Sequence, residues 1–373
     1  MSFFSRSASS QPLIPDQANV QVFYYFDPSA EPPRWRPASS SSDIDPQHQH
    51  QRQHTDPSTE PATDKLHLIS WNIDFQVPAP RERMTAALAY LNDLLTEHAT
   101  QHPNPAPTVI FFQEMVASDL ELIQNTPWVQ ERFYITDRSP TKWRMSSYGT
   151  STLIDRRLSI ERVFRVPYAA SFMQRDGLFV DIGFNSDIPS DKMGVKSPTI
   201  RLCNTHLESL ASGTPKRPLQ VKIASEFMHG RRQENGLPAP NGAILAGDLN
   251  AIAPEDALIP GDCDLNDAFL VLGGEEETED AYTWGKQNAG WLVGKFSDAR
   301  LDKVLFCGGL EVKSLRKIGV GLKARVSVRM SDSDEEQREE EVDDEDDFED
   351  IWVTDHFGLA AEFEVKQTAA REV

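Results

Sequence analysis

The stretch AILAGDLN, residues 243–250, decides the fold of this 373-residue chain. Its first four residues form an apolar run of strand length, and Asp248 and Asn250 follow almost at once. A buried core would not select these polar side chains, so the strand is expected to carry them to the edge of a sheet. Other strand-length runs are bordered by polar side chains of the same kinds, namely Asn72, Glu114, His206, Asp302, Asp355 and His356.

Between the strand-length runs lie two segments whose apolar residues recur at the spacing of an α-helix. Residues 82–98 place apolar side chains in one stripe, which predicts a helix packed against a sheet. A second helix is expected to begin at Thr214 as N-cap, with Pro215 in its first turn, and to end at Gly230. This alternation indicates an α/β (α+β) chain with mixed sheets covered by helices. The second helix should bury Leu219, Ile223 and Phe227, and the expected strands are 66–70, 109–112, 178–184, 200–204, 243–246, 301–306 and 359–365.

The first 64 residues differ in composition from the rest of the chain. From Ala38 to Asp64 the residues are mostly Ser, Pro, Gln, His and Thr, so the segment cannot offset its ordering entropy and is expected to be a disordered linker. Ahead of it, VQVFYYF (20–26) and Trp35 form an aromatic cluster that is expected to dock on the folded domain, with a partner-binding strand as the alternative. The linker also contains histidines that could bind a metal, although a low-complexity tract is the favoured interpretation: His48, His50 and His54.

An acidic stretch interrupts the globular sequence near its end. Residues 331–350 hold fourteen Asp and Glu against one Arg, a local charge of −13, and are expected to form a solvated, disordered insert. The domain organisation that follows is a mostly disordered region over 1–64, one large domain over 65–366 that contains the insert, and a tail over 367–373.

Charge, hydropathy and cysteine content exclude several protein classes. Most of the net charge of −21 lies in the insert and the first 64 residues, so the remainder neither supports nor forbids a nucleic-acid partner. The longest apolar run has six residues, far fewer than a membrane span needs, and the N-terminus lacks a signal-peptide pattern. Cys203, Cys263 and Cys307 cannot all pair, which favours a reduced, intracellular setting.

The polar residues at the strand ends are typical of phosphoester chemistry that uses a hard divalent cation. Mg²⁺ prefers carboxylate and water oxygens, and Glu114 would be costly to bury after four apolar residues unless it met a cation. Zinc fits less well, because no Cys/His pair has finger or HExxH spacing. P-loop and serine-hydrolase motifs are absent from the sequence. Side chains that could orient water or stabilise charge are Asp248, Asn250, Asn72, His206 and His356.

Taken in order, these motifs resemble the endonuclease/exonuclease/phosphatase, or DNase-I-like, superfamily, and within it the tyrosyl-DNA phosphodiesterase branch. The resemblance covers roughly residues 65–366. It implies a four-layer α/β/β/α sandwich, with the motif loops meeting at one edge of the two sheets. The motifs are SWNID (70–74), FFQEM (111–115), NTHLES (204–209), AGDLN (246–250), YTW (282–284), RLDKVLF (300–306) and TDHFGL (354–359).

The resemblance also implies a role for each matching residue. Glu114 would bind Mg²⁺, or Mn²⁺ as the alternative ion, with Asp355 near the metal and Asn72 at the metal–phosphate cluster. Asp248, with Asn250 beside it, would activate or position the attacking water. The remaining implied roles are His356, oriented by Asp302, at the transition state; His206 on a phosphate oxygen; and Trp284 and Tyr148 in the groove near the DNA end. For Trp284 and Tyr148, ordinary buried aromatic residues are an equally favoured interpretation.

The implied activity is Mg²⁺-dependent hydrolysis of 5′-phosphotyrosyl bonds at DNA ends, in nuclear DNA repair, by a monomer. Two departures from the motifs bear on the DNA strand: Phe75 replaces a glycine, and Ile252 stands where a basic residue is expected. Arg175 and Lys142 could compensate, although a plain surface charge is favoured for each. The rival functions are a same-fold nuclease or phosphatase for abasic DNA, lipid or inositol phosphates, and a catalytically silent scaffold. The acidic insert could repel or mimic DNA, or be an inert tether.

Overall fold

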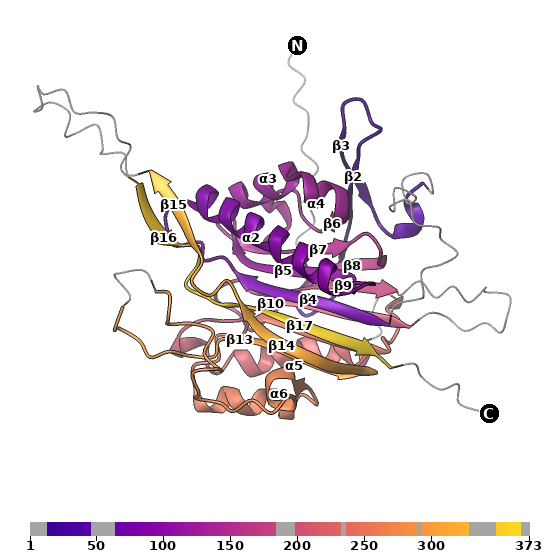
Figure 1. Ribbon diagram of the computed structural model, residues 1–373. Coiled ribbons are helices and arrows are strands. Elements are labelled where there is room, and N and C mark those ends of the chain that lie inside the picture. Colours follow the sequence, from indigo (N-terminus) through magenta and orange to yellow (C-terminus); the bar gives the residue numbers. More distant parts are fainter. Residues whose placement is uncertain are drawn as a thin grey trace, which may run out of the picture.

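Two large β-sheets face each other in the computed structural model, and helices cover their outer sides (Figure 1). The structure describes residues 13–45, 64–183, 198–232, 236–288, 293–327 and 348–366. The expected four-layer α/β/β/α, DNase-I-like sandwich is therefore confirmed. No helix in these ranges is long and apolar enough to cross a membrane.

The first sheet has eight strands, and its order shows that strands far apart in sequence are neighbours. In spatial order they are β14 (Leu310–Ile318), β17 (Gly358–Val365), β4 (Lys65–Asn72), β5 (Thr108–Met115), β7 (Gly149–Asp155), β6 (Phe133–Ile135), β2 (Phe23–Asp27) and β3 (Arg34–Ala38). On its outer face lie α2 (Pro80–Gln101), α3 (Ala117–Asn125) and α4 (Pro127–Arg132).

The second sheet has seven strands and carries the other helices. Its order is β1 (Asn19–Gln21), β8 (Ser159–Pro167), β9 (Asp176–Gly183), β10 (Thr199–His206), β11 (Gly242–Asp248), β13 (Asp302–Gly308) and β12 (Asn266–Asp267). Its outer side carries α5 (Arg217–Met228) and α6 (Ile259–Asp262), whereas Ala268 of the short α7 (Ala268–Val271) belongs to the core between the sheets. Short 3₁₀ helices occur at Ser41–Asp43, Pro140–Lys142, Ala211–Gly213 and Pro254–Leu258.

The sequences of the central strands are continuous apolar runs because both faces of these strands are buried. In β4, Leu66 and Leu68 point into the core between the sheets, whereas Ile69 and Trp71 pack under the helices of the outer layer. In β5, Phe111 belongs to the inner core and its neighbours to the outer one. All seven predicted strands are confirmed, and β4, β5, β10 and β11 extend further, to include the polar residues that follow each apolar run.

Two parallel strand pairs, one in each sheet, position the chemistry. Strand β4 pairs with β5 in parallel across α2, and β10 pairs with β11 in parallel across α5, whereas the other named pairs are antiparallel. Asn72 lies opposite Gln113 in the first pair, and His206 lies opposite Asp248 in the second. Parallel strands end at the same edge, so each sheet delivers two motif loops to one end of the sandwich.

The helix expected after an N-cap at Thr214 begins two residues later, with Lys216 as its N-cap. Helix α5 begins at Arg217 with Pro218, not Pro215, in its first turn, and it ends just before Gly230, which adopts the predicted left-handed backbone at φ +65°. Leu219 was expected to be buried but is 51% exposed. The buried stripe follows the shifted start and consists of Arg217, Gln220, Val221, Ala224, Ser225, Phe227 and Met228, with Ile223 partly buried.

The aromatic N-terminal segment docks on the domain and touches both sheets. Strand β1 pairs with β8 in one sheet, and the hairpin β2–β3 extends the edge of the other. Ala38 belongs to β3, and Ile44 is 2% exposed, so residues 38–45, predicted as linker, are part of the folded domain. Ala38 and Ile44 pack into the core between the sheets, and these contacts with residues distant in sequence order the segment. His48, His50 and His54 lie outside the described residues.

The acidic insert is bordered by a short two-stranded sheet. Strand β15 (Lys323–Ser327) pairs with β16 (Phe348–Trp352), and the pair projects from the body of the molecule (Figure 1). Residues 348–350, predicted as part of the disordered insert, are strand residues of β16, paired with the strand that precedes the insert. Residues 331–347 lie outside the described part of the chain.

Candidate active site

The ends of β4, β5, β10 and β11 bring the predicted polar residues together in one cleft. Each of Glu114, His206 and Asp248 has a coordinating atom within 4.8 Å of those of the other two. Glu114 and Asn250 have left-handed backbones, with φ of 57° and 49°. Such conformations are costly for residues with a Cβ and cluster at functional sites.

Asp248 occupies the centre of this cleft and is 2% exposed. Its Oδ1 accepts a hydrogen bond from the backbone N–H of Asn250 at 2.8 Å, and its Oδ2 accepts one from Nδ2 of Asn72 at 3.1 Å. The Asn72 amide oxygen in turn accepts from the backbone N–H of Asp74, which fixes the direction of its NH₂ group. Burial raises the pKa of Asp248, although the His356 charge opposes this. A carboxylate with a raised pKa is a better proton acceptor.

The Glu114 side chain is 13% exposed, and its carboxyl group lies close to other acidic groups. Its Oε2 accepts only a backbone hydrogen bond, from Phe75 at 3.1 Å, and among the described residues no lysine or arginine forms an ion pair with it. Burial first, and then the nearby Asp74 carboxylate, raise the pKa of Glu114 to about 7. The carboxylates of Asp248 and Asp355 also raise its pKa. This concentration of carboxyl groups fits a divalent cation, which would offset their repulsion.

The orientation of His206 is fixed by Arg175. The guanidinium lies 2.9 Å from Nδ1 of the imidazole, and since a guanidinium can only donate, Nδ1 must accept and Nε2 must carry the proton. Burial and the Arg175 charge lower the pKa of His206 well below its usual range, so the ring is neutral. Within the described part of the chain its Nε2 is buried without a hydrogen-bond partner, 3.6 Å from Glu114 and 3.4 Å from Asp248. His206 therefore presents an N–H donor to the cleft and is a poor metal ligand.

His356 has the opposite electrostatic character. Its Nδ1 lies 2.8 Å from Oδ2 of Asp302, and its Nε2 points at Asp248 and Asp355, 3.8 Å and 3.7 Å away. Burial alone would lower the pKa of His356, but these three carboxylates together raise it well above the usual range. The ring is thus a cation that can donate from Nε2 to a negatively charged group.

Asp355 is positioned by a predicted substrate residue. The indole Nε1 of the half-buried Trp284 donates to Oδ2 of Asp355 at 2.6 Å, and Trp284 also forms a backbone bridge with His356. The other oxygen of Asp355, Oδ1, is buried without a hydrogen-bond partner among the described residues. Such an orphaned oxygen beside Glu114 and Asp248 fits a bound cation. Trp284 thus acts on Asp355, a contact that the sequence did not predict.

Tyr148 and Phe75 form the aromatic wall of the cleft. Their rings stack with centroids 4.0 Å apart and an interplanar angle of 16°. The Arg175 guanidinium lies 5.4 Å from the centre of the Tyr148 ring, and a pocket beside it is lined by Met145, Tyr148, Met173, Arg175 and His206. Arg175 is 6% exposed, so the surface-charge interpretation of this residue is wrong. Lys142 is exposed on a 3₁₀ turn, and Ile252 is 48% exposed.

Four supporting residues were missed by the sequence analysis. Arg83 is 1% exposed and donates to the carbonyls of Ile73, Asp74, Val77, Pro78 and Val353, which joins two of the cleft loops. Thr354 Oγ1 donates to the Asn72 carbonyl, and Glu208 accepts from the loop that carries Arg175. Asp74 faces Asp355, and burial followed by that carboxylate raises the pKa of Asp74 to about 6. Asp74 and Glu208 lie within the sequence motifs SWNID (70–74) and NTHLES (204–209), and their place in these motifs is the sequence feature that could have identified them.

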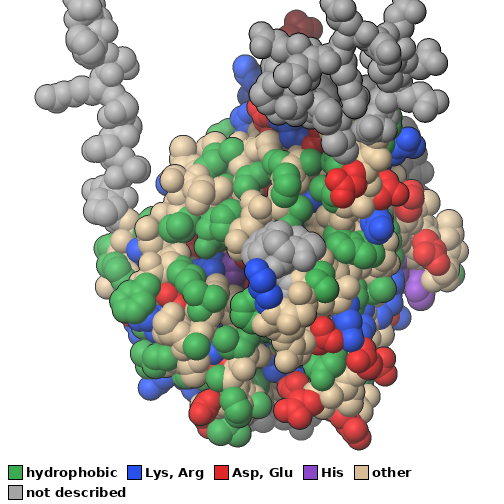
Figure 2. All heavy atoms as spheres, turned by 90° about the vertical axis from the view of Figure 1, so that its left-hand side faces the viewer, with side chains coloured by type: hydrophobic (Ala, Val, Ile, Leu, Met, Phe, Trp, Pro, Cys, Tyr) green, Lys and Arg blue, Asp and Glu red, His purple; other side chains and the backbone are tan. Residues whose placement is uncertain are grey.

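Figure 2 views the side of the molecule at which β4 and β5 end. Among the residues drawn in colour, hydrophobic and uncharged atoms cover much of this face, and basic and acidic side chains are interspersed without a continuous basic surface. Binding of a polyanion here would thus depend on the few donors inside the cleft.

Comparisons with known proteins agree with this geometry. A model of the Endonuclease/Exonuclease/phosphatase family matches residues 69–356. Among solved structures, TDP2 from Danio rerio in complex with a single-strand DNA product is similar, with 17% identity, TM-score 0.54, and coverage of 81% of this chain and 99% of that one. Truncated Caenorhabditis elegans TDP2 has 21% identity, TM-score 0.54, and coverage of 81% and 98%. An endonuclease/exonuclease/phosphatase from Bacteroides vulgatus has 11% identity, TM-score 0.52, and coverage of 81% and 99%. No curated protein matches.

Proposed function

Because the chain belongs to the endonuclease/exonuclease/phosphatase family, whose members hydrolyse phosphoesters, we propose that it is a Mg²⁺-dependent phosphodiesterase that cleaves 5′-phosphotyrosyl bonds at DNA ends. The reaction releases tyrosine and leaves a 5′-phosphate, in nuclear DNA repair and by a monomer. The observation that supports it most is that Glu114, Asp248 and His356 share one buried cleft.

The metal belongs at the acidic side of this cleft. Glu114 and the orphaned oxygen of Asp355 would hold it, with Asn72 beside it. When bound, Mg²⁺, or Mn²⁺ in its place, supplies positive charge next to the phosphoryl oxygens. The two histidines remain as donors, because His206 presents Nε2–H and His356 is a cation.

Each remaining group has a place in the hydrolysis. Asp248 takes a proton from the attacking water, whose oxygen forms a new bond to phosphorus while the bond from phosphorus to the phenol oxygen breaks. His356, held by Asp302, stabilises the negative charge that develops on the phosphoryl group, and His206 donates to another of its oxygens. The phenol of tyrosine has a pKa of about 10, so the phenolate leaves without a strong general acid. It then takes its proton from solvent.

A second candidate is a phosphoesterase of the same fold for other substrates, such as abasic DNA or lipid and inositol phosphates. Two observations favour it. Ile252 exposes an apolar side chain where a contact to the DNA strand would need a positive charge, and the described residues of the cleft face form no continuous basic surface (Figure 2). Neither bears on the hydrolytic residues.

The decisive experiment measures Mg²⁺-dependent turnover on a panel of substrates. A 5′-phosphotyrosyl oligonucleotide should be the preferred substrate over an abasic-site duplex and an inositol phosphate. Glu114→Gln, Asp248→Asn and His356→Ala should each reduce turnover by at least about 10²-fold while the circular dichroism spectrum is retained. The exposed Glu121→Gln is the matched control. Near wild-type rates in all three variants would refute the site, and preference for a lipid or inositol phosphate would refute the substrate.

A further inference from the structure

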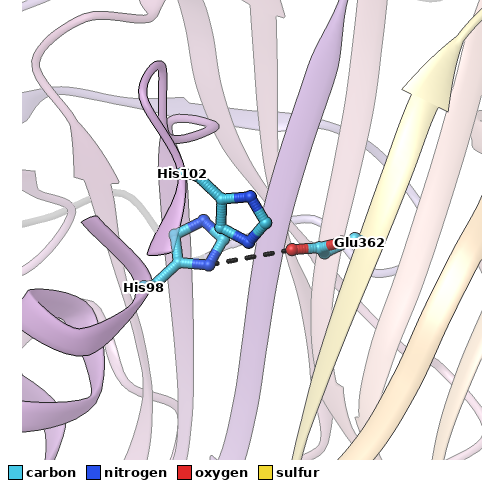
Figure 3. Close-up of side chains that lie close together, drawn as sticks. All are labelled: His98, His102 and Glu362. Atoms are coloured by element: carbon cyan, nitrogen blue, oxygen red, sulfur yellow. Dashed lines mark ion pairs between the residues drawn. The ribbon is translucent and has the colours of Figure 1, made fainter. Parts of the chain in front are cut away.

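A second histidine cluster lies away from the catalytic cleft, where helix α2 ends beside strand β17 (Figure 3). His98 is in the last turn of α2, His102 directly follows the helix, and Glu362 is on β17. Each offers a coordinating atom within 4.8 Å of the other two. In Figure 3 a ring nitrogen of each histidine is turned toward the Glu362 carboxylate.

The local structure explains why these three side chains meet. His98 and His102 are four residues apart, which places them on the same face at the end of a helix. On β17, Ala361 and Phe363 point into the core between the sheets, so Glu362 points to the outer face that α2 covers. The buried His67, opposite Glu362 on β4, stacks on His98 at 4.6 Å and 16°, which holds that ring in place.

An ordinary ion pair does not account for this arrangement. Nδ1 of His98 is 3.7 Å from Oε1 of Glu362, too far for a hydrogen bond, and Nε2 of His98 is buried without a hydrogen-bond partner among the described residues. A neutral imidazole with a ring nitrogen that makes no hydrogen bond is the form that binds metals.

We propose that His98, His102 and Glu362 bind a Zn²⁺ ion, with a fourth coordination position open to water. Two imidazoles and one carboxylate are a ligand set that zinc favours, whereas Mg²⁺ prefers oxygen ligands. Tetrahedral bonds of about 2.1 Å place donor atoms roughly 3.4 Å apart, so the observed separations require only small rotations. His102 is exposed and Glu362 half-buried, which allows those rotations.

The ion would connect two elements that also lead to the catalytic cleft. Strand β17 begins two residues after His356, and Glu362 lies six residues beyond it, about 20 Å along an extended chain. The first turn of α2 carries Arg83, which joins the cleft loops. Zinc would therefore stabilise the packing of α2 on the sheet at a distance from the reacting groups. This inference is independent of the proposed function.

The test is a titration of the full-length, chelator-treated protein with Zn²⁺ in the presence of saturating Mg²⁺, followed by calorimetry. The wild type should bind one tight equivalent that His98→Gln/His102→Gln lacks, with affinity reduced at least about 100-fold, and Glu362→Gln should weaken it about 10- to 100-fold. Zinc should raise the Tm of the wild type by a few degrees and leave the double variant unchanged. Co²⁺ should give visible absorption that depends on the same residues.

The chain provides its own matched control in the histidines of the N-terminal tract. His48→Gln/His50→Gln/His54→Gln removes three histidines and should retain the tight equivalent. A retained circular dichroism spectrum would show that each variant is folded. Should the double variant fail to fold, the single changes His102→Gln and Glu362→Gln, at more accessible positions, decide the question. Unchanged zinc stoichiometry and affinity in the variants that fold would overturn the proposal.

Discussion

Nδ1 of His206 lies 2.9 Å from a guanidinium nitrogen of Arg175, and both side chains are almost completely buried. This contact determines which nitrogen of His206 carries a proton, because an arginine cannot accept a hydrogen bond. It also keeps the imidazole neutral in a cleft crowded with carboxyl groups. The donor that His206 presents is thus set by a residue 31 positions away in sequence.

Replacing Arg175 should impair turnover more than substrate binding. In Arg175→Met the imidazole can adopt the other tautomer, and Nε2 would no longer be held as a donor. We expect kcat to fall about 10- to 100-fold, which corresponds to about 1.4 to 2.8 kcal/mol in the transition state. Steady-state kinetics on a 5′-phosphotyrosyl oligonucleotide would measure this. The exposed Arg81→Met is the control, and equal kinetics in both variants would contradict the assignment.

Asp302 should be required for the charge on His356. In Asp302→Asn the hydrogen bond at Nδ1 can persist, but the carboxylate that raises the pKa of His356 is removed. We expect kcat to fall about 10²- to 10⁴-fold without unfolding. Single-turnover kinetics should show the loss in the chemical step. The exposed Asp264→Asn should retain wild-type rates, and similar rates for Asp302→Asn would contradict the proposed role.

Asp119 should make the stability of the protein depend on pH. Burial raises its pKa to about 6 from 3.8, although its bond to the Val116 backbone N–H opposes this. The folded state therefore keeps its proton when the unfolded state has lost it, and stability falls as the pH rises from 3.8 to 6. Asp119→Asn removes the charge and retains a cap acceptor. It should gain up to about 3 kcal/mol above pH 6 and nothing below pH 4, measured by urea unfolding. An equal gain at both pH values would refute this explanation.

Gly247 should tolerate no side chain. Its φ is +148°, and a Cβ at this position would lie 1.8 Å from the carbonyl oxygen of Thr205 on the neighbouring strand. Gly247→Ala should separate β10 from β11 beside Asp248 and cost more than about 4 kcal/mol. Gly261, where a Cβ would have no neighbour within 4 Å, is the control. Urea midpoints of the two alanine variants should differ clearly, and equal midpoints would disprove the argument.

The interactions that the sequence analysis missed depend on contacts between distant segments. A buried arginine in an amphipathic helix looks like a surface residue, so Arg83 was not recognised as a link between cleft loops. Thr214 and Pro215 form a good helix cap in sequence and therefore predict a helix start there. The actual start of α5 is instead set by the packing of Arg217 against Asp256, 39 residues away in sequence. Ile44 is buried by tertiary contacts that its polar neighbours do not predict.

The sequence by itself determined seven of the strands, their polar ends and the family, because apolar runs and the residues that border them can be recognised without any tertiary contact. It did not determine which side chains carry a proton or which side chains contact one another. Tertiary structure decided that Arg175 holds His206 neutral, that Trp284 holds Asp355, and that His98 and Glu362 meet. Burial and neighbouring charges set the proton state of each group, and both arise only when distant segments of the chain are brought together.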